Sequence, residues 1–315
     1  MVRTIWISVS RLILAGLLGG SVPSVASAHE EPAPEDQIAC AQPDGWFAVE
    51  ARDPRFVVFG EVHGTAESPR LIGDVLCGLA MRGKRVLLAI EFSSNHNAAL
   101  QTAWQVEESD FREALRQGGW ERRKDGVGSV AMLELVERAH RIKSQGSAID
   151  IVAFNGARDG EQRDRFAHLE GQGPHEAAQA ENIALAADAA DYDIIIVLVG
   201  NFHAKKDRVT TGDATFETMA SRLEQYGSVI SLNNASAGGT SWNCQLRDDF
   251  EFVHGAPIPS DAMQCRAFPA SGWPDLNLPP FIALDARGEA EPVFDGYFWL
   301  GQISASPPAF ANAAE

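Results

Sequence analysis

Five short apolar runs alternate along the chain with longer segments of helical character. The runs cover residues 56–59, 86–90, 149–154, 192–199 and 229–232. The segments between and after them carry apolar residues three and four positions apart, which predicts helices within 67–82, 95–119, 129–144, 159–169, 176–190 and 214–226. Alternating strands and helices of this kind predict an α/β fold with a parallel sheet and helices on both faces.

The apolar runs lack the in-and-out alternation of a half-exposed antiparallel sheet, so we expect buried strands. After Gly238 the pattern breaks into short pieces rich in Trp, Pro and Cys, with possible strands at 281–284 and 297–300. The pattern predicts a single domain. Its α/β core covers 45–237, and an irregular C-terminal extension, 238–315, packs on that core.

The first 28 residues have the features of a secretory signal peptide. Arg3 and Arg11 supply positive charge, residues 12–20 are apolar, and Ala26-Ser27-Ala28 fits the small-x-small cleavage pattern. The apolar run is too short for a stable membrane span after cleavage. We therefore expect cleavage near Ala28, a flexible leader over 29–44 and a periplasmic or secreted protein.

An oxidising compartment favours pairing of the four cysteines. Cys244 and Cys265 are close in sequence and are the favoured pair, which leaves Cys40 for Cys77, although four cysteines allow three pairings. No Cys-x-x-Cys motif is present, so redox catalysis and a thiolate zinc site are not expected.

The formal net charge of −17 argues against a nucleic-acid partner, because phosphate binding needs clustered Lys and Arg. Two short basic runs occur, 122–124 and 205–206. A solvated surface is the expected role of both. Lys205 and Lys206 follow His203 directly, so they could instead hold an anionic group of a substrate.

Candidate chemistry gathers at the ends of the predicted strands. The first run ends in Gly60-Glu61-Val62-His63, the second in Glu91, and the fourth in Gly200-Asn201-Phe202-His203. Because ligands bind outside the carboxyl ends of parallel strands, these residues should share one rim of the sheet. Asn155 and Asn233 also follow strands and are expected to be ordinary loop residues.

Two imidazoles and a carboxylate can hold a divalent metal ion and leave a position open for water. His63, Glu91 and His203 are the candidate ligands, with Glu61 as general base, although the two glutamates could exchange roles. Without a metal, a glutamate–histidine pair could activate water directly. The predicted site is therefore Glu61, His63, Glu91 and His203.

The two Gly-x-x-His motifs and the strand-end Glu91 resemble those of the superfamily that joins erythromycin esterase, the haem-binding protein ChaN and the Tiki proteases. The resemblance covers about 56–232 and implies an α/β fold with the site at the strand ends. The Tiki pattern implies metal ligation by His63, Glu91 and His203. The esterase pattern implies activation of water by His63, Glu61 and Glu91.

One helix departs from this pattern. ChaN-like sequences carry Arg-Asp-x-x-Met-Ala before the second motif, and here Glu181 could stand in place of the Asp, with no Arg before it. We expect an exported hydrolase acting on a small molecule or peptide. The alternative is a periplasmic protein that binds haem or iron through His63 and His203. Substrate, metal identity and oligomeric state are left open by the sequence.

Overall fold

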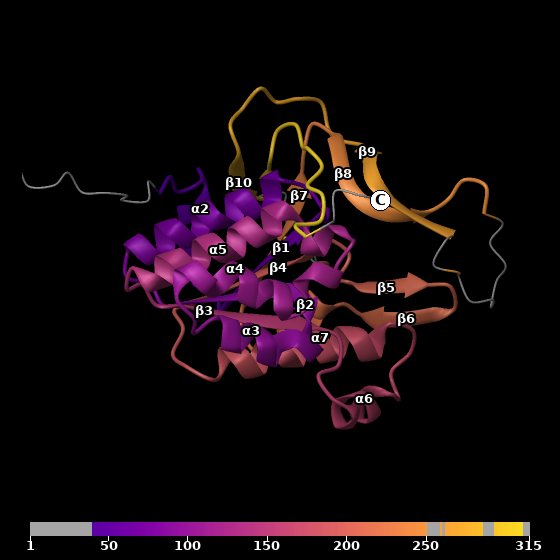
Figure 1. Cartoon of the computed structure of the whole chain (residues 1–315). Helices are drawn as coiled ribbons and strands as arrows, with labels where there is room; N and C mark the ends of the chain where they lie inside the picture. Colours follow the sequence, from indigo (N-terminus) through magenta and orange to yellow (C-terminus); the bar gives the residue numbers. More distant parts are fainter. Residues whose placement is uncertain (1–39, 251–258, 260–261, 286–292, 311–315) are drawn as a thin grey trace, which may run out of the picture. The chain divides into compact units, whose positions relative to one another are not determined.

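The fold is organised around a seven-stranded sheet in the order β10-β11-β7-β1-β4-β2-β3 (Figure 1). The computed structural model describes residues 40–250, 259, 262–285 and 293–310. Strand β10 is antiparallel to β11, and all other neighbouring pairs in the sheet are parallel. The prediction of an α/β fold with a mainly parallel sheet is confirmed.

All five predicted core strands are present, and β1 lies between β4 and β7. Every residue of β1 and β4 is buried, as their unbroken apolar sequences predicted. The strands of the sheet are β1 (Phe56–Glu61), β2 (Val86–Ser93), β3 (Ile149–Asn155), β4 (Ile194–Gly200), β7 (Val229–Ala235), β10 (Phe281–Leu284) and β11 (Gly296–Trp299).

Helices cover both faces of the sheet. On one face, α7 and α8 pack their apolar residues against alternate residues of β1, β2, β3 and β4. Figure 1 shows α2 and α5 on the side opposite α7, and these two helices contact each other. The helices are α1 (Trp46–Glu50), α2 (Glu67–Met81), α3 (Asn97–Ala103), α4 (Glu108–Gln117), α5 (Val130–Ser144), α6 (Gly160–Phe166), α7 (Gly173–Ala187) and α8 (Met219–Leu223).

The helix predicted over 214–226 is largely wrong. Strand β5 (Arg208–Thr211) pairs antiparallel with β6 (Ala214–Glu217), and only α8 is helical in this region. Gly212, with a φ of 60°, and Asp213 form the connecting turn. A Gly-Asp pair between β-branched and aromatic residues is a hairpin signal that outweighs the helical spacing.

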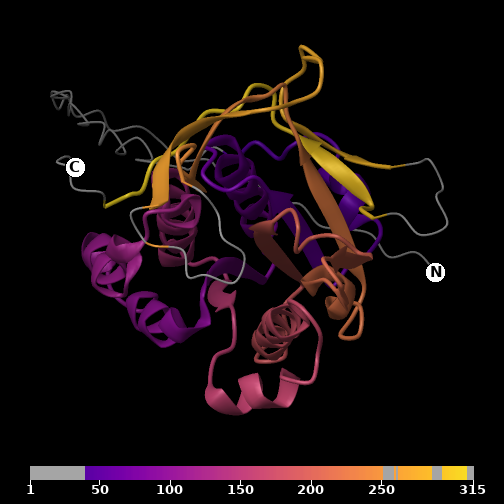
Figure 2. The ribbon, with the colours of Figure 1, turned by 90° about the vertical axis from the view of Figure 1, so that its right-hand side faces the viewer.

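The C-terminal extension is more regular than predicted. It adds β10 and β11 to the sheet, and it forms a hairpin from β8 (Gly239–Leu246) and β9 (Met263–Ala270). Figure 2 shows this orange-to-yellow segment across the top, with the rose-coloured α6 and α7 at the bottom. The extension therefore covers part of the core on the side away from α7.

Both predicted disulfides form: Cys40 with Cys77, and Cys244 with Cys265. The predicted signal peptide and the leader up to residue 39 lie outside the described residues. Within the described part, no helix is long and apolar enough to cross a membrane.

Candidate functional site

The four residues predicted to form a site lie together at the carboxyl ends of β1, β2 and β4. Glu61 is the last residue of β1 and pairs in register with Gly200, the last residue of β4. Glu91 lies near the end of β2, the other neighbour of β4. His63 and His203 follow two and three residues after β1 and β4. Their convergence follows from the parallel order of the three strands.

His63 lies between two carboxylates. Its Nδ1 is 2.9 Å from Glu61 Oε1, and its Nε2 is 3.1 Å from Glu91 Oε2. The side chain of His63 is 28% exposed, whereas those of Glu61 and Glu91 are 1% and 8% exposed. The imidazole therefore forms the accessible part of a group whose carboxylates are buried.

Glu91 connects the two histidine motifs. Its Oε2 accepts a hydrogen bond of 2.6 Å from the backbone N–H of Gly200, and its Oε1 lies 3.7 Å from His203 Nε2. Burial raises the pKa of Glu91, but His63, His203 and the Gly200 N–H more than offset this and lower it to about 2. Glu91 is thus a fixed negative charge facing both imidazoles.

The glycines of the two motifs let the strand ends approach closely. A Cβ on Gly200 would lie 2.8 Å from His63 Nε2, and a Cβ on Gly60 would lie 2.7 Å from the Cβ of Ala204. Side chains at these positions would displace the imidazole or separate β1 from the segment after β4. The glycine in each Gly-x-x-His motif is therefore required by the packing of the site.

The partner of His203 was missed at the sequence level. His203 Nδ1 lies 2.7 Å from Oε1 of Glu176, whose Oε2 accepts a hydrogen bond of 2.7 Å from the backbone N–H of Met219. Glu176 is fully buried in the first part of α7. A carboxylate among small apolar helix residues was the available signal, because such a group is rarely buried without a partner.

Glu181 does not take the place suggested for it. Its carboxylate lies 3.1 Å from Arg158 and 2.8 Å from Arg165, away from His203. The acidic residue of α7 that contacts His203 is Glu176.

The protonation of the site follows from burial and charge. Burial raises the pKa of Glu61, although the hydrogen bond from His63 lowers it in part. Burial lowers the pKa of His63 and of His203, but the carboxylates beside them raise both, that of His63 well above its ordinary range. The surroundings therefore favour the charged form of both imidazoles and the protonated form of Glu61.

Lys206 forms two ion pairs within the fold. Its Nζ lies 3.0 Å from Glu224 and 3.2 Å from Asp295. Asp295 in turn accepts a hydrogen bond of 2.8 Å from the backbone N–H of Ser231 on β7. The lysine thus joins α8, β7 and the segment before β11.

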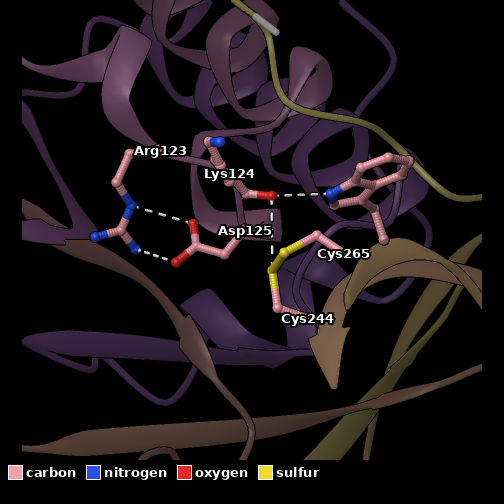
Figure 3. The surroundings of a disulfide bond; sticks show 6 residues. Arg123, Lys124, Asp125, Cys244 and Cys265 are labelled. Carbon is pink, nitrogen blue, oxygen red and sulfur yellow. Dashed lines mark hydrogen bonds and ion pairs between the residues drawn. A yellow bond between two sulfur atoms is a disulfide. The ribbon is translucent and has the colours of Figure 1, made fainter. Parts of the chain in front are cut away.

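The loop that carries His63 is held by the C-terminal extension. Gly64 accepts hydrogen bonds from the backbone N–H groups of Trp242 (2.9 Å) and Ser306 (2.8 Å). The indole N–H of Trp242 donates to the carbonyl of Lys124 (2.9 Å), and the Cys244 sulfur lies 3.8 Å from the same oxygen. Figure 3 shows the disulfide beside this carbonyl and the Arg123–Asp125 ion pair.

The proposed metal ligands have suitable donor atoms, but their spacing is that of hydrogen-bonded pairs. Both ring nitrogens of His63 are within hydrogen-bond distance of a carboxylate. Among the described residues, no group of three or more His, Cys, Asp or Glu side chains is arranged to hold a metal ion. We therefore derive no step through a metal, and its presence stays a prediction.

Comparisons with known proteins identify the fold. No protein-family model and no curated protein sequence matches this chain. An erythromycin esterase mutant in its open conformation matches with a TM-score of 0.59 and 11% identity, over 84% of this chain and 95% of that one. A Bacillus cereus protein matches with a TM-score of 0.53 and 10% identity, over 81% of this chain and 90% of that one.

The ChaN of Campylobacter jejuni, whose structure has cofacial haem, is also similar. It matches with 10% identity and a TM-score of 0.37, over 60% of this chain and 84% of that one. The chain therefore has the fold of erythromycin esterase, as its resemblance to that superfamily predicted.

Proposed function

We propose that this protein is a hydrolase that cleaves an ester or amide with water activated by Glu61, without a metal in the catalytic step. The observation that carries the proposal is the continuous set of contacts Glu61–His63–Glu91–His203–Glu176 at one rim of the sheet. Perturbed, buried titratable groups gathered at strand ends are typical of catalytic sites.

Glu61 is the best candidate for the general base. Its pKa is raised by burial, which brings the carboxylate closer to the neutral range in which a base works best. Its Oε1 binds His63, while its Oε2 is buried and has no hydrogen-bond partner in the described part of the chain. We assign this oxygen to accept the proton of the attacking water, which requires that substrate binding open a path for water to it.

The two imidazoles supply positive charge where the reaction needs it. As water attacks the carbonyl carbon, negative charge develops on the carbonyl oxygen. The Nε2–H of His203, which lies 3.7 Å from Glu91, can donate to this oxygen, and the charge of His63 stabilises it from nearby. His203 then gives its Nε2 proton to the leaving oxygen or nitrogen, and an acid and an alcohol or amine result. The proton that Glu61 took from the water replaces the one that His203 gave up, which restores the site. Glu91 and Glu176 hold the rings in place throughout.

The esterase neighbour supports the reaction class only as a hypothesis, since a likeness at 11% identity concerns the fold. A panel of 4-nitrophenyl esters and anilides tests the proposal. We expect turnover by the wild type and a loss on the order of 10² to 10³ in kcat for His63→Ala and His203→Ala. His140→Ala serves as control, because His140 is buried against Phe111 and Trp104, away from the site.

Haem binding is the competing outcome. A stoichiometric Soret shift that is lost in both site-histidine variants, together with no turnover on any ester or anilide, would replace hydrolysis by haem binding. Turnover that is unchanged in both variants would refute the assigned residues.

A further inference from the structure

The turn of α7 that supplies Glu176 also brings a third histidine to the site. The ring centroid of His175 lies 5.8 Å from that of His203, and the side chain is half-buried. The water-activating residues proposed above do not include His175. Its surroundings nevertheless fix which of its two nitrogens carries a proton.

A buried glutamine one helical turn later holds the ring. Gln179 is fully buried, and its Nε2 lies 2.9 Å from His175 Nε2 and 3.0 Å from Oδ1 of Asn155, the last residue of β3. An amide nitrogen has two hydrogens and no acceptor capacity. If both are used in these contacts, His175 Nε2 must be an unprotonated acceptor and the ring proton must be on Nδ1.

The opposite orientation of the amide is less favourable. At present the buried Oε1 of Gln179 has no hydrogen-bond partner among the described residues. Exchanging oxygen and nitrogen would leave two buried N–H donors without partners in place of that one acceptor. An unpaired buried donor costs the free energy of its lost hydration. The present orientation of the Gln179 amide leaves one acceptor unpaired, and it is therefore preferred over the exchanged orientation, which leaves two donors unpaired.

We propose that Gln179 and Asn155 hold His175 as a neutral imidazole whose Nδ1–H donates a hydrogen bond to an acyl oxygen of the substrate beside His203. This inference rests on the proposed hydrolytic function. No other hydrogen bond involves the His175 ring among the described residues, so Nδ1–H is its available donor. His175 is then a substrate-binding residue, and Gln179 is a positioning residue that acts through it.

The tautomer is measurable without any substrate. In protein labelled with ¹⁵N-histidine, long-range ¹H–¹⁵N correlation spectra distinguish a protonated ring nitrogen from an unprotonated one. We expect His175 to carry its proton on Nδ1 at neutral pH. Gln179→Glu, which has almost the same shape but offers an acceptor, should move the proton to Nε2. A proton on Nε2 in the wild type would overturn the proposal.

Kinetics with a 4-nitrophenyl ester test the donor itself. His175→Asn places an amide N–H near the position of Nδ1, whereas His175→Gln places it near Nε2. We expect losses in kcat/KM on the order of 10² for His175→Ala and His175→Gln, with most of it in kcat, and a much smaller loss for His175→Asn. His168→Ala, an exposed histidine bonded to the Arg165 carbonyl, should match the wild type.

Two results separate this inference from the proposed function. If the wild type hydrolyses the ester and His175→Ala does so equally well, the donor role is wrong and the hydrolase stands. If no ester or anilide is turned over, titration with an alkylphosphonate monoester, which mimics the tetrahedral oxyanion, decides. If the phosphonate leaves the ¹⁵N signal of His175 Nδ1 in the wild type unshifted, the donor role is overturned independently of activity.

Discussion

Glu91 makes a contribution to stability that Glu91→Gln should remove. The carboxylate is 8% exposed, accepts the Gly200 N–H and faces His63 Nε2 at 3.1 Å. The pKa of Glu91 falls from the ordinary 4.5 to about 2, since its cationic and N–H partners outweigh burial. At 1.36 kcal/mol per pKa unit this lowering corresponds to about 3 kcal/mol at neutral pH.

The sign of the pH dependence follows from the lowered pKa. A carboxylate that titrates lower in the folded than in the unfolded state stabilises the fold above its unfolded-state pKa, here 4.5. The contribution is lost as the pH falls from there towards 2. The difference in stability between wild type and Glu91→Gln should therefore be largest at pH 7 and shrink below pH 4.5.

Thermal unfolding followed by calorimetry at several pH values measures this difference. For a domain of this size, about 3 kcal/mol corresponds to a Tm lowered by roughly 6–12 °C at pH 7. Glu113→Gln is a matched control, because hydrogen bonds from Arg116 and Gln117 also lower the pKa of Glu113 to about 2. The side chain of Glu113 is 53% exposed, so solvent screening should leave its variant with a nearly unchanged Tm.

Equal changes in Tm for Glu91→Gln and Glu113→Gln would refute this reasoning, because the burial of Glu91 would then add nothing to the stabilisation. A Glu91→Gln deficit that stays constant from pH 7 to pH 3 would refute it as well, because the linkage to the carboxyl proton would be absent.

Three further changes have defined outcomes. Gly200→Ala should abolish ester hydrolysis while circular dichroism stays near wild type, because the added methyl meets the His63 ring; wild-type turnover would contradict the packing argument. Glu176→Gln should lower the pKa of His203, measured by NMR titration, because Glu176 raises it; an unchanged pKa would show that the contact is not made. Replacing Cys244 and Cys265 by Ser should cost about 3 kcal/mol in urea unfolding, as expected for a crosslink 21 residues apart.

The sequence was sufficient to predict the part of the candidate site that lies at the strand ends. Glu61, His63, Glu91 and His203 each follow an apolar run, and parallel order alone brings the ends of such strands to one edge. The apolar runs themselves were unambiguous, because strands buried on both faces have no polar positions to confuse the pattern.

The part of the candidate site that lies on α7 depends on how this helix packs against the sheet. The spacing of apolar residues in the sequence does not reveal that packing. Glu176 reaches His203 only because α7 packs on the sheet with its first turns beside the end of β4. A shift of one residue in that packing would turn Glu176 away. For the same reason the sequence pointed to Glu181, which lies on the same helix but contacts Arg158 and Arg165.

The most direct test of the proposed site is ester hydrolysis by protein freed of metal with a chelator, its metal content checked by elemental analysis, for wild type, Glu61→Gln and His63→Ala. Water activation by Glu61 predicts that the metal-free wild type keeps its kcat and that both variants lose it by about 10² or more. Loss of wild-type activity on chelation, restored by adding a divalent ion, would contradict the account and assign the water to a metal.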